Sequence, residues 1–177
     1  MPADASRSAV VVRVSVPARL DQLRGRWDPA AAVGVPGHVT ILYPFVSPAD
    51  LDGRVRTALA EVAATNAPFD VRFDRVGRFP TVVYLVPDPP EPFIRLTEAV
   101  QERFPNLLPY EGAFDEVIPH LTIADSDEAP LDVVATEATA ALPVVFRVSR
   151  LDVLVQGADG RWRSRWRLPF AHRSDRD

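Results

Sequence analysis

Two short segments of the chain carry the same order of residue types. The segments His38-Val39-Thr40-Ile41 and His120-Leu121-Thr122-Ile123 both read histidine, aliphatic residue, threonine, isoleucine. The chain holds only three histidines. Two such matches have a chance probability on the order of 1%, whereas one match alone would carry little weight. On a β-strand the histidine and threonine of each segment share one face, and the aliphatic residues face the core.

These residue types suit phosphodiester chemistry if a pseudo-twofold brings the two segments together across one groove. A neutral imidazole accepts a proton from an attacking oxygen, and a protonated imidazole donates one to the leaving oxygen. Threonine hydroxyls can stabilise the charge that develops on phosphate oxygens. We therefore predict His38, Thr40, His120 and Thr122 as catalytic residues. The alternative is structural, because threonine favours strands and a half-buried histidine is often only hydrogen-bonded.

Elements that could position these residues alternate along the chain. Strands are predicted over 10–16, 37–43, 69–73, 76–79, 81–86 and 119–124, and helices over 20–27, 47–64, 91–104 and 131–142. Residues 106–118 are expected to be irregular, and residues 144–170 to form two or three strands with a hairpin turn at 157–160. This order predicts an α+β or α/β sandwich.

Composition excludes several function classes. The chain has 177 residues and no cysteine, so a disulfide framework, a Cys-ligated zinc site and a thiol nucleophile are excluded. A net charge of −4 disfavours a broad nucleic-acid surface and favours a small fragment or an RNA terminus as substrate. We find no membrane-spanning stretch and no signal peptide, and expect a cytoplasmic protein.

We expect no metal and no cofactor. No Asp, Glu or Cys recurs near the two histidines with ligand spacing. The acidic residues Asp125, Asp127 and Glu128 follow the second motif, where calcium or magnesium binding is conceivable. Turn and helix-start chemistry explains them better.

The sequence resembles the 2H phosphoesterase superfamily, in particular its 2′-5′ RNA ligase/cyclic nucleotide phosphodiesterase-like branch. The resemblance rests on the two His-x-Thr motifs, whose histidines lie 82 positions apart, and on residues 37–45, 77–85 and 109–124. It implies a bilobal, pseudo-twofold α+β sandwich, with antiparallel sheets lining a central groove and helices outside. We accordingly expect residues 1–177 to form a single domain of two lobes, with 171–177 a flexible tail that holds an idle His172.

The resemblance also implies an activity, the opening of 2′,3′-cyclic phosphates on RNA 3′ ends or small nucleotides to 2′-phosphates. Some relatives also join RNA ends through a 2′-5′ linkage without ATP. His38 would be the general acid and His120 the general base, and the two threonines would hold the phosphate. A non-catalytic module that binds a nucleotide or RNA terminus is an alternative, as is an ATP-independent 2′-5′ RNA ligase.

Weaker signals concern substrate contacts. Tyr43 and Tyr84 are candidate platforms for a base, although core packing would explain each equally well. Residues 161–168 alternate, which predicts one face of arginines and one face with both tryptophans. The arginine face is either a strip that binds an RNA backbone or the solvated face of an edge strand. We expect a monomer with no protein partner.

Overall fold

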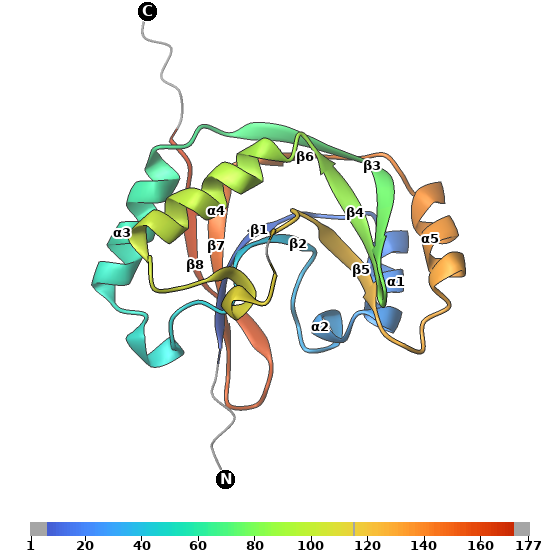
Figure 1. Ribbon diagram of the computed structural model, residues 1–177, viewed down its shortest axis with the longest axis horizontal. Helices are drawn as coiled ribbons and strands as arrows, with labels where there is room; N and C mark the ends of the chain where they lie inside the picture. The colour runs from blue at the N-terminus through green and yellow to red at the C-terminus, as the bar shows by residue number, and fades with distance from the viewer. Residues whose placement is uncertain (1–6, 115, 172–177) are drawn as a thin grey trace, which may run out of the picture.

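Two antiparallel sheets of four strands each form the framework of the computed structural model, which describes residues 7–114 and 116–171. In the first sheet the order is β2-β1-β7-β8, and in the second it is β5-β4-β3-β6. The bounds are β1 Ser8–Arg13, β2 His38–Leu42, β3 Phe69–Phe79, β4 Val82–Asp88, β5 Leu121–Asp125, β6 Val144–Val148, β7 Arg150–Gln156 and β8 Trp162–Pro169. The two motif strands, β2 and β5, are both edge strands, and they contact each other (Figure 1).

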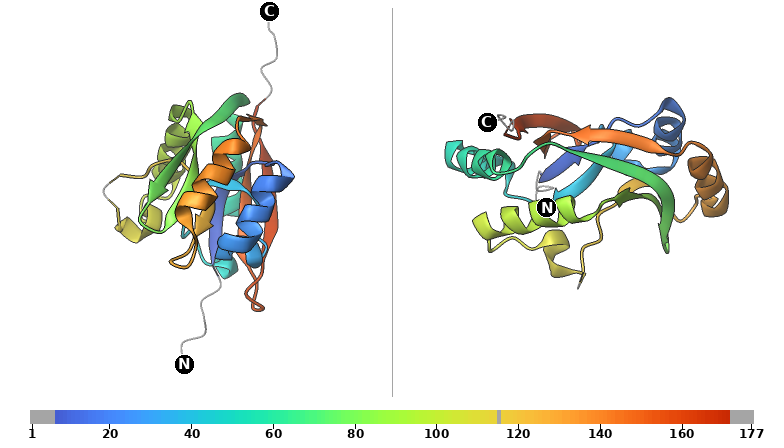
Figure 2. Two further views of the ribbon diagram at one scale, coloured as in Figure 1. Left: turned by 90° about the vertical axis from the view of Figure 1, so that its right-hand side faces the viewer. Right: turned by 90° about the horizontal axis from the view of Figure 1, so that it is seen from above.

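Helices cover the outer faces of both sheets. Their bounds are α1 Ala18–Trp27, α2 Pro29–Ala32, α3 Gly53–Ala64, α4 Glu91–Arg103 and α5 Leu131–Ala140, with 3-10 turns η1 at Pro48–Asp50 and η2 at Pro109–Gly112. Helices α3 and α4 lie on one side of the molecule, and α1 and α5 lie on the other (Figures 1 and 2). The predicted α+β sandwich is confirmed.

Two helices cross between the sheets. Helix α1 follows β1 of the first sheet but contacts β5 of the second. Helix α4 follows β4 of the second sheet but contacts β2 of the first. Each motif strand is therefore supported by a helix that comes from the other half of the chain.

The alternation predicted for the motif strands is present. Val39 and Ile41 are 0% and 1% exposed, and Leu121 and Ile123 are both fully buried. They belong to a large apolar cluster that joins both sheets to their helices. The threonine between each pair is only half-buried, so it faces away from this core. A separate small cluster on the other face of the first sheet contains Ala9, Val11, Val35 and Leu154.

Several predicted boundaries were wrong, and the strand expected over 10–16 ends already at Arg13. The helix expected from Ser47 begins at Gly53, because Asp52 accepts hydrogen bonds from the amides of Arg54 and Val55 (2.9 and 3.0 Å) and provides the cap. Ser47 caps only the short η1 turn. The segments 69–73 and 76–79 are one strand, β3, whose pairing with β4 shifts register in between.

The predicted faces of β8 were also wrong. Trp162 packs against the small apolar cluster, whereas Trp166 packs against the large one. The cause is a register shift in the β7–β8 pairing, where one extra residue of β8 reverses the alternation. The predicted hairpin turn at 157–160 is confirmed by the hydrogen bond from the Gly157 amide to the Arg161 carbonyl (2.8 Å).

Of the expected tail, only Ala171 is described, and its amide donates to the Asn66 carbonyl (3.0 Å). Residues 172–177, with His172, lie outside the described residues. Within the described ranges, no helix has the length and apolar character needed to cross a membrane.

Candidate active site

The two motif histidines are anchored in the same way. His38 opens β2, and its Nδ1 lies 2.8 Å from the Pro36 carbonyl oxygen. His120 lies within the strand predicted over 119–124 but directly precedes β5, which begins at Leu121, and its Nδ1 lies 2.6 Å from the Ile118 carbonyl oxygen. A carbonyl only accepts, so Nδ1 carries the proton in each neutral ring. Nε2 then holds the lone pair that can exchange a proton with a substrate.

Glycine at position 37 sets the start of β2. The Gly37 carbonyl accepts a hydrogen bond from the Val14 amide (2.8 Å), which draws the ends of β1 and β2 together. A Cβ at Gly37 would lie 2.7 Å from the Val14 carbonyl oxygen, so a larger residue would push the strands apart. His38 therefore enters the site from a tightly fixed backbone.

Burial makes both imidazoles poor bases in the free protein. The pKa of His38 is lowered to about 4, chiefly by burial and to a smaller extent by the charges of Arg24 and His120, while the hydrogen bond with the Pro36 carbonyl opposes the shift. The effect of His120 on His38 indicates that the two rings are electrostatically coupled. Burial also lowers the pKa of His120, opposed by the Ile118 carbonyl and by the charge of Asp125. In the free protein both rings therefore favour the neutral form near pH 7, and the negative charge of a phosphate bound beside them would favour protonation of one ring.

Tyr110, which sequence reasoning missed, lies beside Thr40. Its phenol lies near enough to the Thr40 side chain to interact with it, and burial raises the pKa of the phenol, which therefore stays protonated. Its amide donates to the Tyr43 carbonyl (2.6 Å), which ties the irregular segment to the end of β2. Tyr110 and Glu111 both have positive φ (50° and 56°), a backbone conformation that is costly for these residues. The only sequence signal was the position of Tyr110 within the segment 109–124.

Aromatic rings enclose His120. The rings of Phe79 and Tyr84 each lie 5.4 Å from the imidazole, and they stack on each other at 4.5 Å. A Cβ at Gly77 would collide with the Tyr84 ring, so glycine permits this packing. Tyr84 is only 9% exposed. Its contacts are those of a packed wall that supports His120.

A cavity of about 250 Å³ adjoins the other histidine. Its polar side contains His38, Thr40 and Tyr43. The rest is lined by Ala9, Val11, Ala30, Val35, Leu154 and Trp162. Arg7 donates to the Tyr43 hydroxyl (2.8 Å) and so fixes that ring at the rim. Trp162, another residue missed by sequence reasoning, enters the site because the register shift turns it inward.

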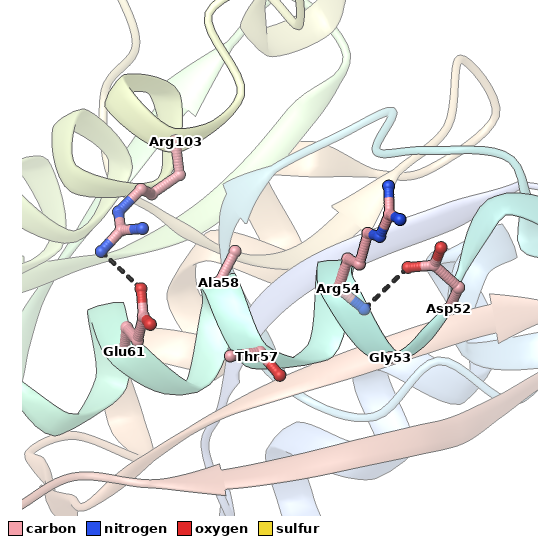
Figure 3. Close-up of a pocket in the computed structure, with 7 residues that line it drawn as sticks. All are labelled: Asp52, Gly53, Arg54, Thr57, Ala58, Glu61 and Arg103. Atoms are coloured by element: carbon pink, nitrogen blue, oxygen red, sulfur yellow. Dashed lines mark hydrogen bonds and ion pairs between the residues drawn. The ribbon is translucent and has the colours of Figure 1, made fainter.

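A larger hollow of about 610 Å³ lies between α3 and α4 and contains neither histidine. Figure 3 shows the Arg103–Glu61 ion pair (2.6 Å) on one side of it and Asp52 at the start of α3 on the other. Arg103 and Glu61 pair with each other, Asp52 caps α3, and the hollow brings none of the predicted site residues together. Within 7–114 and 116–171, no group of three or more His, Cys, Asp or Glu is placed to hold a metal ion.

Arg24 of α1 lies behind the two motif strands and is only 2% exposed. Its Nε donates to the Thr122 carbonyl (3.2 Å), and its Nη2 donates to the Val35 carbonyl (3.1 Å) and to Asp28 Oδ2 (3.0 Å). Helical spacing gave no reason to assign this arginine to a site. Its position becomes visible only when α1 crosses to the second sheet.

Comparison with known proteins identifies the family. The model of the 2′-5′ RNA ligase superfamily matches residues 12–160. A putative phosphoesterase of Bacillus pumilus (strain SAFR-032) is 30% identical over 146 residues, which cover 78% of this chain and 81% of that protein. The chain therefore belongs to the 2′-5′ RNA ligase superfamily, and the resemblance to 2H phosphoesterases is confirmed.

Solved structures share the fold. TT0787 of Thermus thermophilus is similar with a TM-score of 0.64 and 19% identity, covering 95% of this chain and 100% of that one. E. coli LigT complexed with 3′-AMP is similar with a TM-score of 0.52 and 18% identity, covering 94% and 98%. The family supports a phosphoesterase or RNA ligase-like function for this chain.

Proposed function

We propose that the protein is a metal-independent phosphoesterase that opens 2′,3′-cyclic phosphates to 2′-phosphates by two-histidine acid–base catalysis. The observation that carries this proposal is the matched anchoring of the two imidazoles. Each is held through Nδ1 by the carbonyl two residues before it, on edge strands that contact each other. A structural histidine needs no second, equally anchored and electrostatically coupled partner.

In this mechanism one imidazole takes a proton from water as the water oxygen attacks phosphorus. The bond from phosphorus to the ribose 3′ oxygen breaks, and the other imidazole, protonated, gives its proton to that oxygen. The product is a 2′-phosphate with a free 3′ hydroxyl, and each histidine ends in the state in which the other began. Thr40, Thr122 and Tyr110 donate to the non-bridging oxygens and stabilise their developing charge.

The assignment of acid and base depends on the surrounding charges. The resemblance implies His38 as acid and His120 as base. Arg24 disfavours protonated His38, whereas Asp125 favours protonated His120, so the charges of the free protein favour the opposite order. Asp125→Asn should lower the pKa of His120. A downward shift of the alkaline limb of kcat/KM would identify His120 as the acid, and a downward shift of the acidic limb would identify it as the base.

We infer that the nucleoside enters on the His38 side. The cavity there is mostly apolar, has an aromatic rim of Tyr43 and Trp162, and opens onto His38 and Thr40. Among the described residues no carboxylate, lysine or arginine lines it, so it suits a base without demanding a particular one. The crystal structure of E. coli LigT with 3′-AMP supports a nucleotide ligand. Tyr84, packed against His120, we assign to positioning that ring.

The test is incubation of the purified protein with nucleoside 2′,3′-cyclic phosphates in excess EDTA, followed by phosphorus NMR. We expect only the 2′-phosphate, and a kcat lowered by about 10²- to 10⁴-fold in His38→Ala and His120→Ala proteins whose thermal melts match the wild type. Turnover at the wild-type rate in either variant would overturn the two-histidine mechanism. Nucleotide binding without turnover by the wild type would favour a binding module, and joining of two RNA halves would identify a ligase.

A further inference from the structure

We propose that Arg24 is a positioning residue that locks the two His-x-Thr segments to each other across the boundary between the sheets. The proposal rests on the function assigned above to the two histidines. Arg24 itself touches neither a substrate nor a reacting atom in this scheme. It acts on the backbone that carries the motifs.

The guanidinium holds one carbonyl within the second motif and one in the chain that leads into the first motif. Nε donates to the carbonyl of Thr122, within the second motif, at 3.2 Å. Nη2 donates to the carbonyl of Val35 at 3.1 Å, one residue before Pro36, whose own carbonyl anchors His38. A single planar group with donors in fixed directions therefore sets the distance between the two segments.

Arg24 is itself held rigidly. Asp28, 4% exposed, accepts from Nη2 at 3.0 Å, and its other carboxylate oxygen accepts from the Ala30 amide at 3.0 Å. Asp21, on the exposed side, lies 3.6 Å from Nη1 and is a weak partner. Burying an arginine has a desolvation free energy that destabilises the fold, and the ion pair and hydrogen bonds of Arg24 offset it.

The second crossed helix offers a natural comparison. Helix α4 reaches β2 from the other half, and Thr97 donates there to the Ile41 carbonyl at 3.0 Å. This hydroxyl holds one strand, whereas Arg24 holds both segments. The comparison predicts a larger catalytic effect for loss of Arg24 than for loss of the Thr97 hydroxyl.

The charge of Arg24 acts on the pKa of His38, which can be measured independently of any effect of Arg24 on packing. Arg24 lowers the pKa of His38, whereas the charge that acts on the pKa of His120 is that of Asp125. The ionisable groups that pair with Arg24 on its own side are Asp21 and Asp28. Removal of the guanidinium should therefore raise the pKa of one histidine only.

The experiment uses the full chain with three changes: Arg24→Gln/Asp28→Asn, Arg24→Lys and Thr97→Val. The double variant removes both buried charges and keeps an acceptor that caps α2. Asp21→Asn is the matched control, because it removes only the exposed partner of Arg24. Kinetics with a nucleoside 2′,3′-cyclic phosphate and NMR titration of the histidine side chains are measured on each protein.

We expect the double variant to lose about 10- to 100-fold in kcat, with KM changed by less than about threefold, because the imidazoles lose their mutual alignment. The pKa of His38 should rise while that of His120 stays constant. Arg24→Lys should keep the low pKa of His38 yet show reduced kcat, since the single nitrogen of lysine lacks the spaced, planar donors with which the guanidinium spans the two carbonyls. Thr97→Val should lose less kcat than either, and Asp21→Asn should behave as wild type.

Two results would overturn the proposal: a folded double or lysine variant with wild-type kcat, or a His38 titration that does not move in the double variant. If the double variant fails to fold, Arg24→Lys, which keeps Asp28 paired, decides through kcat. If the wild type does not turn over cyclic phosphates, the proposed reaction fails. The NMR titration still decides whether Arg24 controls His38.

Discussion

The two His-x-Thr segments have the same residues and the same anchoring but different surroundings. Both histidines donate from Nδ1 to a carbonyl two residues earlier. Around His38 the sheet carries small apolar side chains that leave an open cavity. Around His120 the corresponding space is filled by the stacked rings of Phe79 and Tyr84. The two proposed catalytic histidines thus share one kind of anchoring, whereas only the surroundings of His38 leave a cavity that could hold a nucleoside in the proposed function.

The charges are asymmetric as well. A buried arginine lies near His38 and disfavours its protonation, while a carboxylate near His120 favours protonation. A duplicated motif therefore yields two histidines that are not equivalent. The comparison can be tested by changing matched residues on the two sides.

The largest expected effect comes from the histidines themselves. His38→Ala and His120→Ala should each lower kcat by about 10²- to 10⁴-fold, because each removes one proton-transfer group. The kcat of a variant with both histidines replaced should be little lower than that of either single variant, because the two histidines act as a unit. Steady-state kinetics at pH 7 check this. If only one substitution lowered kcat, the other histidine would not be a proton-transfer group.

The second prediction concerns stability against pH. The pKa of His38 is lowered from 6.5 to about 4 on folding, so the unfolded chain binds the proton more readily. The stability that comes from keeping this ring neutral is present above about pH 6.5 and is lost as the pH falls towards 4. The loss is at most about 3 kcal/mol.

Urea unfolding across this pH range measures the effect. His38→Gln should flatten the pH dependence of the unfolding free energy between pH 6.5 and 5. His120→Gln should flatten it less, because Asp125 opposes the lowering of that pKa. An unchanged slope in His38→Gln would show that this ring is not kept neutral by folding.

The third prediction compares the two motif threonines, whose replacement should have smaller effects on kcat than replacement of the histidines. Thr122→Val should lower kcat by about 10- to 100-fold, because one donor to the phosphate is lost. Thr40→Val should cost less, because the Tyr110 phenol beside Thr40 still donates. Adding Tyr110→Phe to Thr40→Val should bring the loss up to that of Thr122→Val. Equal effects of both single threonine variants would exclude Tyr110 as a substitute donor.

Local patterns predicted much of this architecture. Strand alternation around positions 39–41 and 121–123, the helix expected over 91–104 and the hairpin turn at 157–160 depend on near neighbours in the chain, and the structure has them. The repeat of His-x-Thr pointed to both histidines because a repeated motif is a local signal too.

The missed residues depend on long-range geometry. Arg24 reaches the site because α1 crosses to the second sheet, and Trp162 faces the cavity because of a register shift in β8. Tyr110 reaches Thr40 from an irregular segment whose backbone has positive φ. None of these features leaves a periodic pattern in the sequence.

The cavity gives the smallest effect and the sharpest test of the asymmetry. Ala30 lines the cavity beside His38 without contributing a polar group, so Ala30→Leu should narrow it and leave the histidines in place. We expect KM for a nucleoside 2′,3′-cyclic phosphate to rise by about three- to tenfold with kcat nearly constant, because a lost fit removes binding that ground and transition states share. For ribose 2′,3′-cyclic phosphate, which has no base, KM should stay the same. If both substrates lost equally, the cavity would not hold the base, and the nucleoside would have to lie along the aromatic wall near His120.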